Sequence, residues 1–103
     1  HDSLAEAYFC ANDIMAYGFT KALKEKGYKI PQDISIVGFD NLPMSATLDP
    51  SLTTIDVSKR KIGSMAVTVL DELLNAEGSL PAVKVQVGAE LVVRASTTPK
   101  KTD

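Results

Sequence analysis

The sequence predicts an α/β domain built on a parallel sheet, because two short apolar segments flank a helical pattern. Residues 34–38, Ile-Ser-Ile-Val-Gly, form a nearly continuous apolar run that is typical of a strand buried on both faces of a parallel sheet. Residues 7–11, Ala-Tyr-Phe-Cys-Ala, form a second run of about one strand's length. A helix between two such strands makes a βαβ unit, and its strands are therefore expected to be parallel.

An amphipathic helix is expected between these strands. Asn12 and Asp13 are good residues to cap its start, and Gly27 stands where a glycine commonly ends a helix. A turn over residues 31–33 then leads into the second strand. Met15, Phe19, Ala22, Leu23 and Lys26 recur at helical spacing, and the four apolar residues among them form the stripe predicted to pack on the sheet.

Two polar residues follow the carboxyl ends of the predicted strands. Asn12 comes after the first strand and Asp40 after the second, where Gly38 can bend the chain. These ends share one edge of the sheet, the edge at which ligands bind in open α/β sheets. A carboxylate beside an amide suits a hydroxyl-bearing ligand such as a sugar. The alternative interpretation is that Asp40 and Asn41 only turn the chain.

The rest of the chain is predicted to contain one long helix and several short extended segments. Residues 41–52 should form a loop with one helical turn, and residues 53–57 a short strand. A helix over 59–77, capped by Ser58 and ending at Gly78, has the strongest periodicity in the chain. Its apolar face consists of Ile62, Met65, Ala66, Val69, Leu70, Leu73 and Leu74.

Two further strands and a tail are expected after this helix. Valines alternate with polar residues over 83–87, and a second extended run covers 90–94. Residues 97–103 should form a frayed tail. The start of the long helix carries three cations, which are interpreted as a solvated basic patch rather than an anion contact. These cations are Lys59, Arg60 and Lys61.

Composition and missing motifs exclude several classes of function. The 103 residues are 45% hydrophobic and 23% charged, which is typical of a globular chain. A net charge of −2 argues against a nucleic-acid-binding face here, and no apolar run could span a membrane. The single cysteine, Cys10, is expected to be a buried thiol. No catalytic motif, metal-ligand set or cofactor pattern appears, so no enzymatic activity, metal or cofactor is expected.

Four ordered sequence blocks resemble the lac repressor/gal repressor family of bacterial transcription regulators. They cover essentially the whole chain and match the family in order and spacing. The resemblance implies the C-terminal part of an effector-binding region, an incomplete periplasmic-binding-protein-like (type I) fold of two α/β lobes. The four blocks are residues 9–16, FCANDIMA, 30–41, IPQDISIVGFDN, 50–55, PSLTTI, and 90–97, ELVVRAST.

The resemblance also implies roles for individual residues. In the family, the Asn of the Ala-Asn-Asp motif and the Asp of the Val-Gly-Phe-Asp motif hydrogen-bond the effector, and they correspond to Asn12 and Asp40. The effector is usually a sugar, and sometimes a purine or a protein co-regulator. Family dimers use the first helix and the loop after the Asp motif, and aromatic residues and Met are enriched at interfaces. The residues expected at such a homo-oligomer interface are Tyr17, Leu42, Met44 and Leu48. The alternative is that these residues fill the core of their own lobe.

The chain departs from the family pattern, because the DNA-binding helix-turn-helix, the hinge and most of the first lobe are missing. Residues 1–52 would then belong to the C-terminal lobe, 53–96 would hold the crossing and parts of the other lobe, and 97–103 the tail. Operator DNA would bind only through the missing head, in the cytoplasm. The alternatives are a sugar-binding component of a transporter, which shares this fold, and an α/β hydrolase-type enzyme that uses Asp40.

The apolar face of the helix 59–77 lacks its receiving sheet, which in the family lies in the missing lobe. The helix could fold back on the first two strands, pack against another copy of the chain, or be covered by the missing segment. We favour another copy, including exchange of the segment after Val57 between protomers. The test is the burial of three residues of this face: Ile62, Val69 and Leu73.

Overall fold

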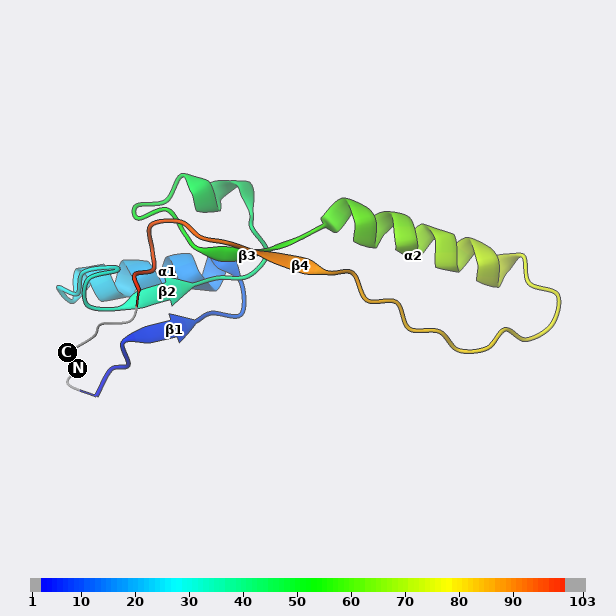
Figure 1. Cartoon of the computed structure of the whole chain (residues 1–103), viewed down its shortest axis with the longest axis horizontal. Coiled ribbons are helices and arrows are strands. Elements are labelled where there is room, and N and C mark those ends of the chain that lie inside the picture. Colours follow the sequence, from blue (N-terminus) through cyan, green and yellow to red (C-terminus); the bar gives the residue numbers. More distant parts are fainter. Residues whose placement is uncertain (1–2, 100–103) are drawn as a thin grey trace. The chain divides into compact units, whose positions relative to one another are not determined.

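The computed structural model describes residues 3–99, which divide into two compact units. The first unit contains the residues up to Asp56 together with those from Glu90 onward, and the second unit is Val57–Ala89. Along the chain the elements are β1, α1, β2, the short 3-10 helix η1, β3, α2 and β4 (Figure 1). None of the described helices is long and apolar enough to cross a bilayer.

Two parallel strands organise the first unit. β1 (Ala7–Phe9) pairs with β2 (Ser35–Val37), with Tyr8 opposite Ile36. α1 (Asp13–Glu25) connects the two strands, so the predicted parallel βαβ unit is confirmed. The strands are shorter than the apolar runs that predicted them, because only three residues of each run pair with the other strand.

Local sequence accounts for both ends of α1. The side chain of Asn12 caps the helix, with Oδ1 accepting a hydrogen bond from the Met15 amide at 2.8 Å. Gly27 follows the helix with a φ of 91°, a conformation that glycine adopts without the clash of a Cβ. The predicted start and end of this helix are therefore confirmed.

The face of α1 that packs on the core differs from the predicted face. Ala16 and Leu23 are buried, and Phe19 packs against them while half-buried. Two of the four apolar residues of the predicted face are exposed instead: Met15 and Ala22. The prediction was wrong for these residues because the buried face begins with Asp13, a charged residue that apolar spacing leaves out.

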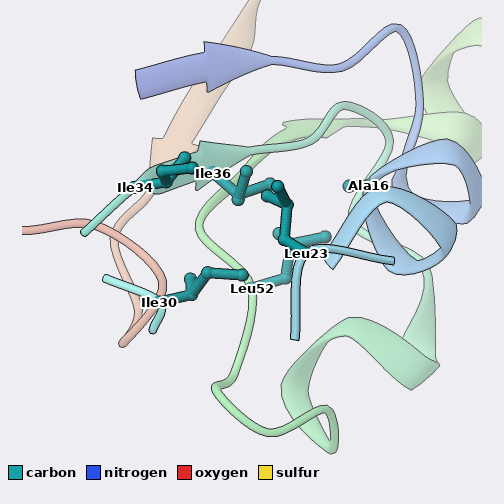
Figure 2. Close-up of a cluster of buried hydrophobic side chains, with 6 residues drawn as sticks. All are labelled: Ala16, Leu23, Ile30, Ile34, Ile36 and Leu52. Carbon is teal, nitrogen blue, oxygen red and sulfur yellow. The ribbon is translucent and has the colours of Figure 1, made fainter. Parts of the chain in front are cut away.

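Six buried hydrophobic side chains form the core of the first unit, and Figure 2 shows them converging from α1, β2 and the loops beside them. Leu52, from the loop before β3, closes this cluster against the side chains of the βαβ unit. Burying each Ile or Leu stabilises the fold by about 1.5–3 kcal/mol. The six residues are Ala16, Leu23, Ile30, Ile34, Ile36 and Leu52.

The segment after β4 is bound to the edge of β2 that β1 leaves open. The amide of Ile36 donates to the carbonyl of Ser96 at 2.9 Å, and Ser96 Oγ donates back to the Ile36 carbonyl at 2.6 Å. Ser96 Oγ also accepts a hydrogen bond from the Thr53 amide at 2.8 Å. This buried hydroxyl therefore joins β2 to the residue that precedes β3.

Hydrogen bonds also hold the next two residues. Thr97 Oγ1 pairs with Thr53 Oγ1 at 2.9 Å, and the Thr98 amide donates to Ser35 Oγ at 3.2 Å. The prediction of a frayed tail over 97–103 is therefore wrong for Thr97 and Thr98. Residues 100–103 of that prediction lie outside the described part of the chain.

The short elements η1 and β3 follow β2 in the predicted order. η1 (Pro43–Ala46) is the single helical turn expected in the loop 41–52. β3 (Thr54–Val57) confirms the strand expected at 53–57, and it pairs with β4 (Ala89–Val92) in a second two-stranded sheet.

The second unit consists of α2 and the irregular segment that follows it. α2 (Lys59–Leu74) is capped by Ser58 Oγ, which accepts a hydrogen bond from the Lys61 amide at 3.3 Å. The helix ends before the predicted residue 77, because Asn75 caps it there and its Nδ2 donates to the Asp71 carbonyl at 2.9 Å.

The strand predicted at 83–87 is absent from the structure. Residues 79–88 have no regular secondary structure, because no neighbouring strand in this unit supplies the backbone hydrogen bonds that a strand needs. Side chains in the second unit are half-buried or exposed throughout. The three residues chosen as a test are not buried either: Ile62 is 44% exposed, Val69 half-buried and Leu73 58% exposed. Packing of this face against another copy stays a prediction.

Candidate functional site

The loops that leave β1 and β2 contact each other at the carboxyl edge of the parallel pair. The Cys10 amide donates to the Val37 carbonyl at 2.8 Å, and the Asp13 amide donates to the Phe39 carbonyl at 3.1 Å. Asn12 and Asp40 are the immediate neighbours of Asp13 and Phe39, so both stand on the same edge. Each side chain is half-buried.

Asp40 and Asn41 adopt an uncommon backbone conformation for residues with side chains. Asp40 has a φ of 121° and Asn41 a φ of 53°. The Asp40 amide donates to the Ile55 carbonyl at 2.9 Å, and the Asn41 amide donates to Thr54 Oγ1 at 3.3 Å. Two consecutive residues are thus held by β3 in a strained conformation, a feature that clusters at ligand-binding sites.

Asp13, which sequence reasoning treated only as a capping residue, is a fully buried hydrogen-bonding centre behind this edge. Its Oδ2 accepts from the Leu42 amide at 2.8 Å and from Ser45 Oγ at 2.5 Å. Its Oδ1 accepts from Thr54 Oγ1 at 2.6 Å. Helical spacing from Leu23 and Ala16 would have placed it on the buried face.

The pKa of Asp13 reflects these contacts. Burial raises the pKa of the carboxyl group, but hydrogen bonds from Ser45 and Thr54 and backbone hydrogen bonds at Leu42 and Phe39 outweigh burial. The pKa is therefore lowered from its ordinary value of 3.8. Asp13 is an ionised group at neutral pH that holds the loop after β2 and the start of β3 against α1.

Gly38 fits closely against this carboxylate. A Cβ at this position would clash with Asp13 Oδ1 and would lie 2.9 Å from Leu52 Cδ2. Gly38 was expected to let the chain bend, but its φ is not positive, so its backbone conformation does not require glycine. Glycine is needed here because any side chain would displace the carboxylate of Asp13.

A second polar cluster lies beside Asp40. Arg94 donates from Nη2 to Asn41 Oδ1 at 2.8 Å and from Nη1 to the Leu52 carbonyl at 3.0 Å. Asn41 Nδ2 in turn donates to Asp56 Oδ1 at 3.3 Å. Sequence reasoning missed Arg94, although it lies in one of the four blocks that carry the resemblance.

Of the four residues expected at a subunit interface, Tyr17 and Leu48 lie beside the same hollow. Tyr17 is 45% exposed and lines, with Leu48 and Leu52, a hollow of about 420 Å³ on the first unit. Leu48 also packs against the core cluster while half-buried. Leu42 and Met44 are half-buried and lie at the start of η1.

The described residues offer little for metal or thiol chemistry. Among residues 3–99, no group of three His, Cys, Asp or Glu side chains is placed to hold a metal ion. Cys10 is half-buried rather than fully buried, and burial raises the pKa of its thiol. A raised pKa keeps the thiol protonated at neutral pH, so it is a poor nucleophile.

Comparison with known proteins places this geometry in context. The family model described as "Periplasmic binding protein-like domain" matches residues 2–97. The HTH-type transcriptional repressor PurR of Pasteurella multocida is 46% identical over 95 residues, which are 92% of this chain and 28% of the repressor. The chain thus spans little more than a quarter of the length of this curated relative.

Two solved structures share the fold of the chain. A LacI family transcriptional regulator from Enterococcus faecium, solved with bound ribose, is 35% identical with a TM-score of 0.81, covering 97% of this chain and 37% of that one. The transcription regulator CcpA of Lactococcus lactis is 26% identical with a TM-score of 0.85, covering 94% of this chain and 35% of that one. The predicted family resemblance and the incomplete periplasmic-binding-protein-like α/β fold are confirmed.

Proposed function

Because this chain belongs to the periplasmic-binding-protein-like family, and within it to the lac repressor/gal repressor regulators, we propose that it forms part of the effector-binding region of a ligand-responsive transcription regulator. The observation that carries the proposal is the placement of Asn12 and Asp40 on one edge of the parallel pair. The named relatives are regulators, so they favour this function over a transporter component or an enzyme that uses Asp40.

The effector in this proposal is a small molecule that both donates and accepts hydrogen bonds. Asn12 Oδ1 already accepts the Met15 amide, so Asn12 would serve the ligand as a donor through Nδ2. The Asp40 carboxylate would accept from ligand hydroxyl or N–H groups. A sugar fits this pair, and the related Enterococcus faecium regulator was solved with ribose. A purine-like molecule is the second candidate, within the range of effectors that the family resemblance implies.

Regulation would follow from differential binding of two states. An effector that contacts this edge and the other lobe binds the closed state more tightly than the open state, and it shifts the population accordingly. Operator DNA would be bound by a head outside this chain, in the cytoplasm, without membrane contact. The chain itself would bind ligand without converting it.

Effector binding by this chain alone should be weak, because a cleft ligand is normally buried 70–90% by surrounding walls and this edge supplies one wall. Calorimetry with pentoses, hexoses and purines is expected to find nothing tighter than about millimolar, roughly −4 kcal/mol. Micromolar binding would show that the site is complete within the chain.

The decisive experiment uses the protein extended upstream to the length of its relatives. A gel-shift assay with operator DNA should respond to the effector, and Asp40→Asn should lose this response while DNA binding persists. Asn75→Ala, whose side chain caps α2, is the matched control and should keep the response. Equal effector responses in the Asp40→Asn variant and the unsubstituted protein would contradict the proposal.

A homodimer is the second part of the proposal. It rests on exposed Tyr17 beside Leu48, with Leu42 and Met44 at the start of η1. Tyr17→Asp should shift the extended protein toward monomer in sedimentation, since a charge at an interface core is unfavourable. Retained assembly, or outright unfolding, would contradict this interface.

A further inference from the structure

The side chain of Asn41 contacts both segments through which the chain passes between its compact units. The chain leaves the first unit after Asp56 in β3 and re-enters it at Glu90 in β4. Asn41 Nδ2 donates to Asp56 Oδ1, and Asn41 Oδ1 accepts from Arg94, four residues beyond the second crossing. We call the segments around Asp56 and around residues 90–94 the two crossing segments. The side-chain amide of Asn41 thus donates a hydrogen bond to one crossing segment and accepts a hydrogen bond from the other.

The backbone of Asn41 is tied to the same place. Its φ of 53° lies in the left-handed region, and its amide bonds Thr54 Oγ1. Asp40, immediately before it, is held at a φ of 121° while its amide bonds the Ile55 carbonyl. Such strained conformations persist only where surrounding contacts impose them.

We propose that Asn41 is a positioning residue that fixes the Asp40 loop to both crossing segments. Through it, a displacement of Asp40 would be passed to Asp56 and Arg94, and a displacement of either crossing would move Asp40. The proposal depends on the proposed function only in taking Asp40 as a ligand contact. Arg94 contributes because its two nitrogens hold Asn41 and the Leu52 carbonyl at once.

The test is hydrogen exchange of single amides, measured by NMR on this chain. Asn41→Gly removes the side chain without adding strain, because glycine readily adopts a positive φ. The Asp40 amide reports on the loop, the Arg94 amide on the second crossing, and the Cys10 amide, bonded to Val37, on the parallel pair. We expect exchange at Asp40 and Arg94 to accelerate about tenfold or more relative to Cys10.

A second variant separates the two halves of the contact. Asn41→Asp keeps an acceptor for Arg94 but loses the donor to Asp56, so Asp40 exchange should accelerate while Arg94 exchange changes little. It also serves if the glycine variant does not fold. Asn75→Ala removes an amide that bonds Asp71 in α2, and it should leave all three reporters unchanged.

Equal acceleration at Asp40, Arg94 and Cys10 would overturn the proposal, because Asn41 would then only support global stability. Unchanged exchange at Asp40 would overturn it as well. Neither result depends on a ligand. Failure here would leave the effector role of Asp40 standing, and failure of the gel-shift test would leave this positioning role standing.

Discussion

Leu23 in α1 is 4% exposed and Leu73 in α2 is 58% exposed, although both were assigned to the apolar face of an amphipathic helix. In the first unit, α1 packs on a core that also takes residues from β2 and the loop before β3. In the second unit, α2 has no buried residue. Periodicity therefore identifies a helix, whereas the burial of its apolar residues depends on whether the chain supplies a receiving surface.

The burial of polar side chains also differs between the two units. The first unit buries Asp13, Ser45, Thr54 and Ser96, and each of these side chains has at least one hydrogen bond. In the second unit, side-chain hydrogen bonds such as those of Ser58 and Asn75 are exposed and local to α2. Buried hydrogen-bond networks favour one packing arrangement, and among the described residues they lie in the first unit.

The largest effect is expected from Asp13→Ala, which removes the centre of the buried network. Three donors, from Leu42, Ser45 and Thr54, would lose their acceptor. At about 1–3 kcal/mol for each unsatisfied group, the free energy of unfolding should fall by about 3–9 kcal/mol. Urea denaturation measures the change. A loss below about 1 kcal/mol would mean that water replaces the carboxylate easily.

A matched pair of leucine substitutions tests the comparison directly. Leu23→Ala should lower the free energy of unfolding by about 2–5 kcal/mol, because it leaves a cavity in the core. Leu73→Ala should change it by about 0.5 kcal/mol or less, as at other exposed positions. Both are measured by urea denaturation at low protein concentration. A large loss for Leu73→Ala would show that α2 is covered in solution, and its dependence on protein concentration would reveal a second copy.

A smaller loss of stability is expected when acid protonates Asp13, because the protonated side chain keeps its size and shape. Its folded pKa lies below the ordinary value of 3.8, so the unfolded chain takes up the proton first as pH falls. The stability that Asp13 contributes is thus fully present above the ordinary value and is lost as pH falls through the folded pKa. Urea midpoints from about pH 6 to about pH 2 should fall less in Asp13→Asn than in the unsubstituted chain. If the urea midpoints of the two proteins fell equally with pH, the lowered pKa of Asp13 would be contradicted.

Much of the first unit was predictable because its signals are local. The cap at Asn12, the glycine after α1 and the two apolar runs specify a parallel βαβ unit, which places Asn12 and Asp40 on one edge. Helical spacing could have placed Asp13 on the buried face of α1, but the hydrogen-bond partners behind that edge were not predictable. In the sequence, Asp13 has the position of an ordinary capping residue. Its hydrogen-bond partners Ser45 and Thr54 lie more than 30 positions away in the chain.

The second unit shows a different limit of prediction from sequence. The alternating valines of residues 83–87 have the pattern of a strand, but a strand forms only where another strand pairs with it. The pattern is intrinsic to these residues, whereas the pairing depends on a neighbour that this unit does not provide. Asn41 and Arg94 were missed for a related reason, since their contact joins residues 53 positions apart.

The separation of 60 positions between Ile36 and Ser96 has a consequence for synthesis. Both backbone groups of Ile36 bond Ser96, so the open edge of β2 is completed by a residue made 60 positions later. Protein synthesis proceeds from the N-terminus, and residues 57–89 therefore emerge while Ile36 lacks this partner, although Thr53 is already available to pair with Val37 on the same edge. An unpaired strand edge can associate with other chains. The nascent first unit is thus exposed to mispairing at Ile36 until Ser96 has been made.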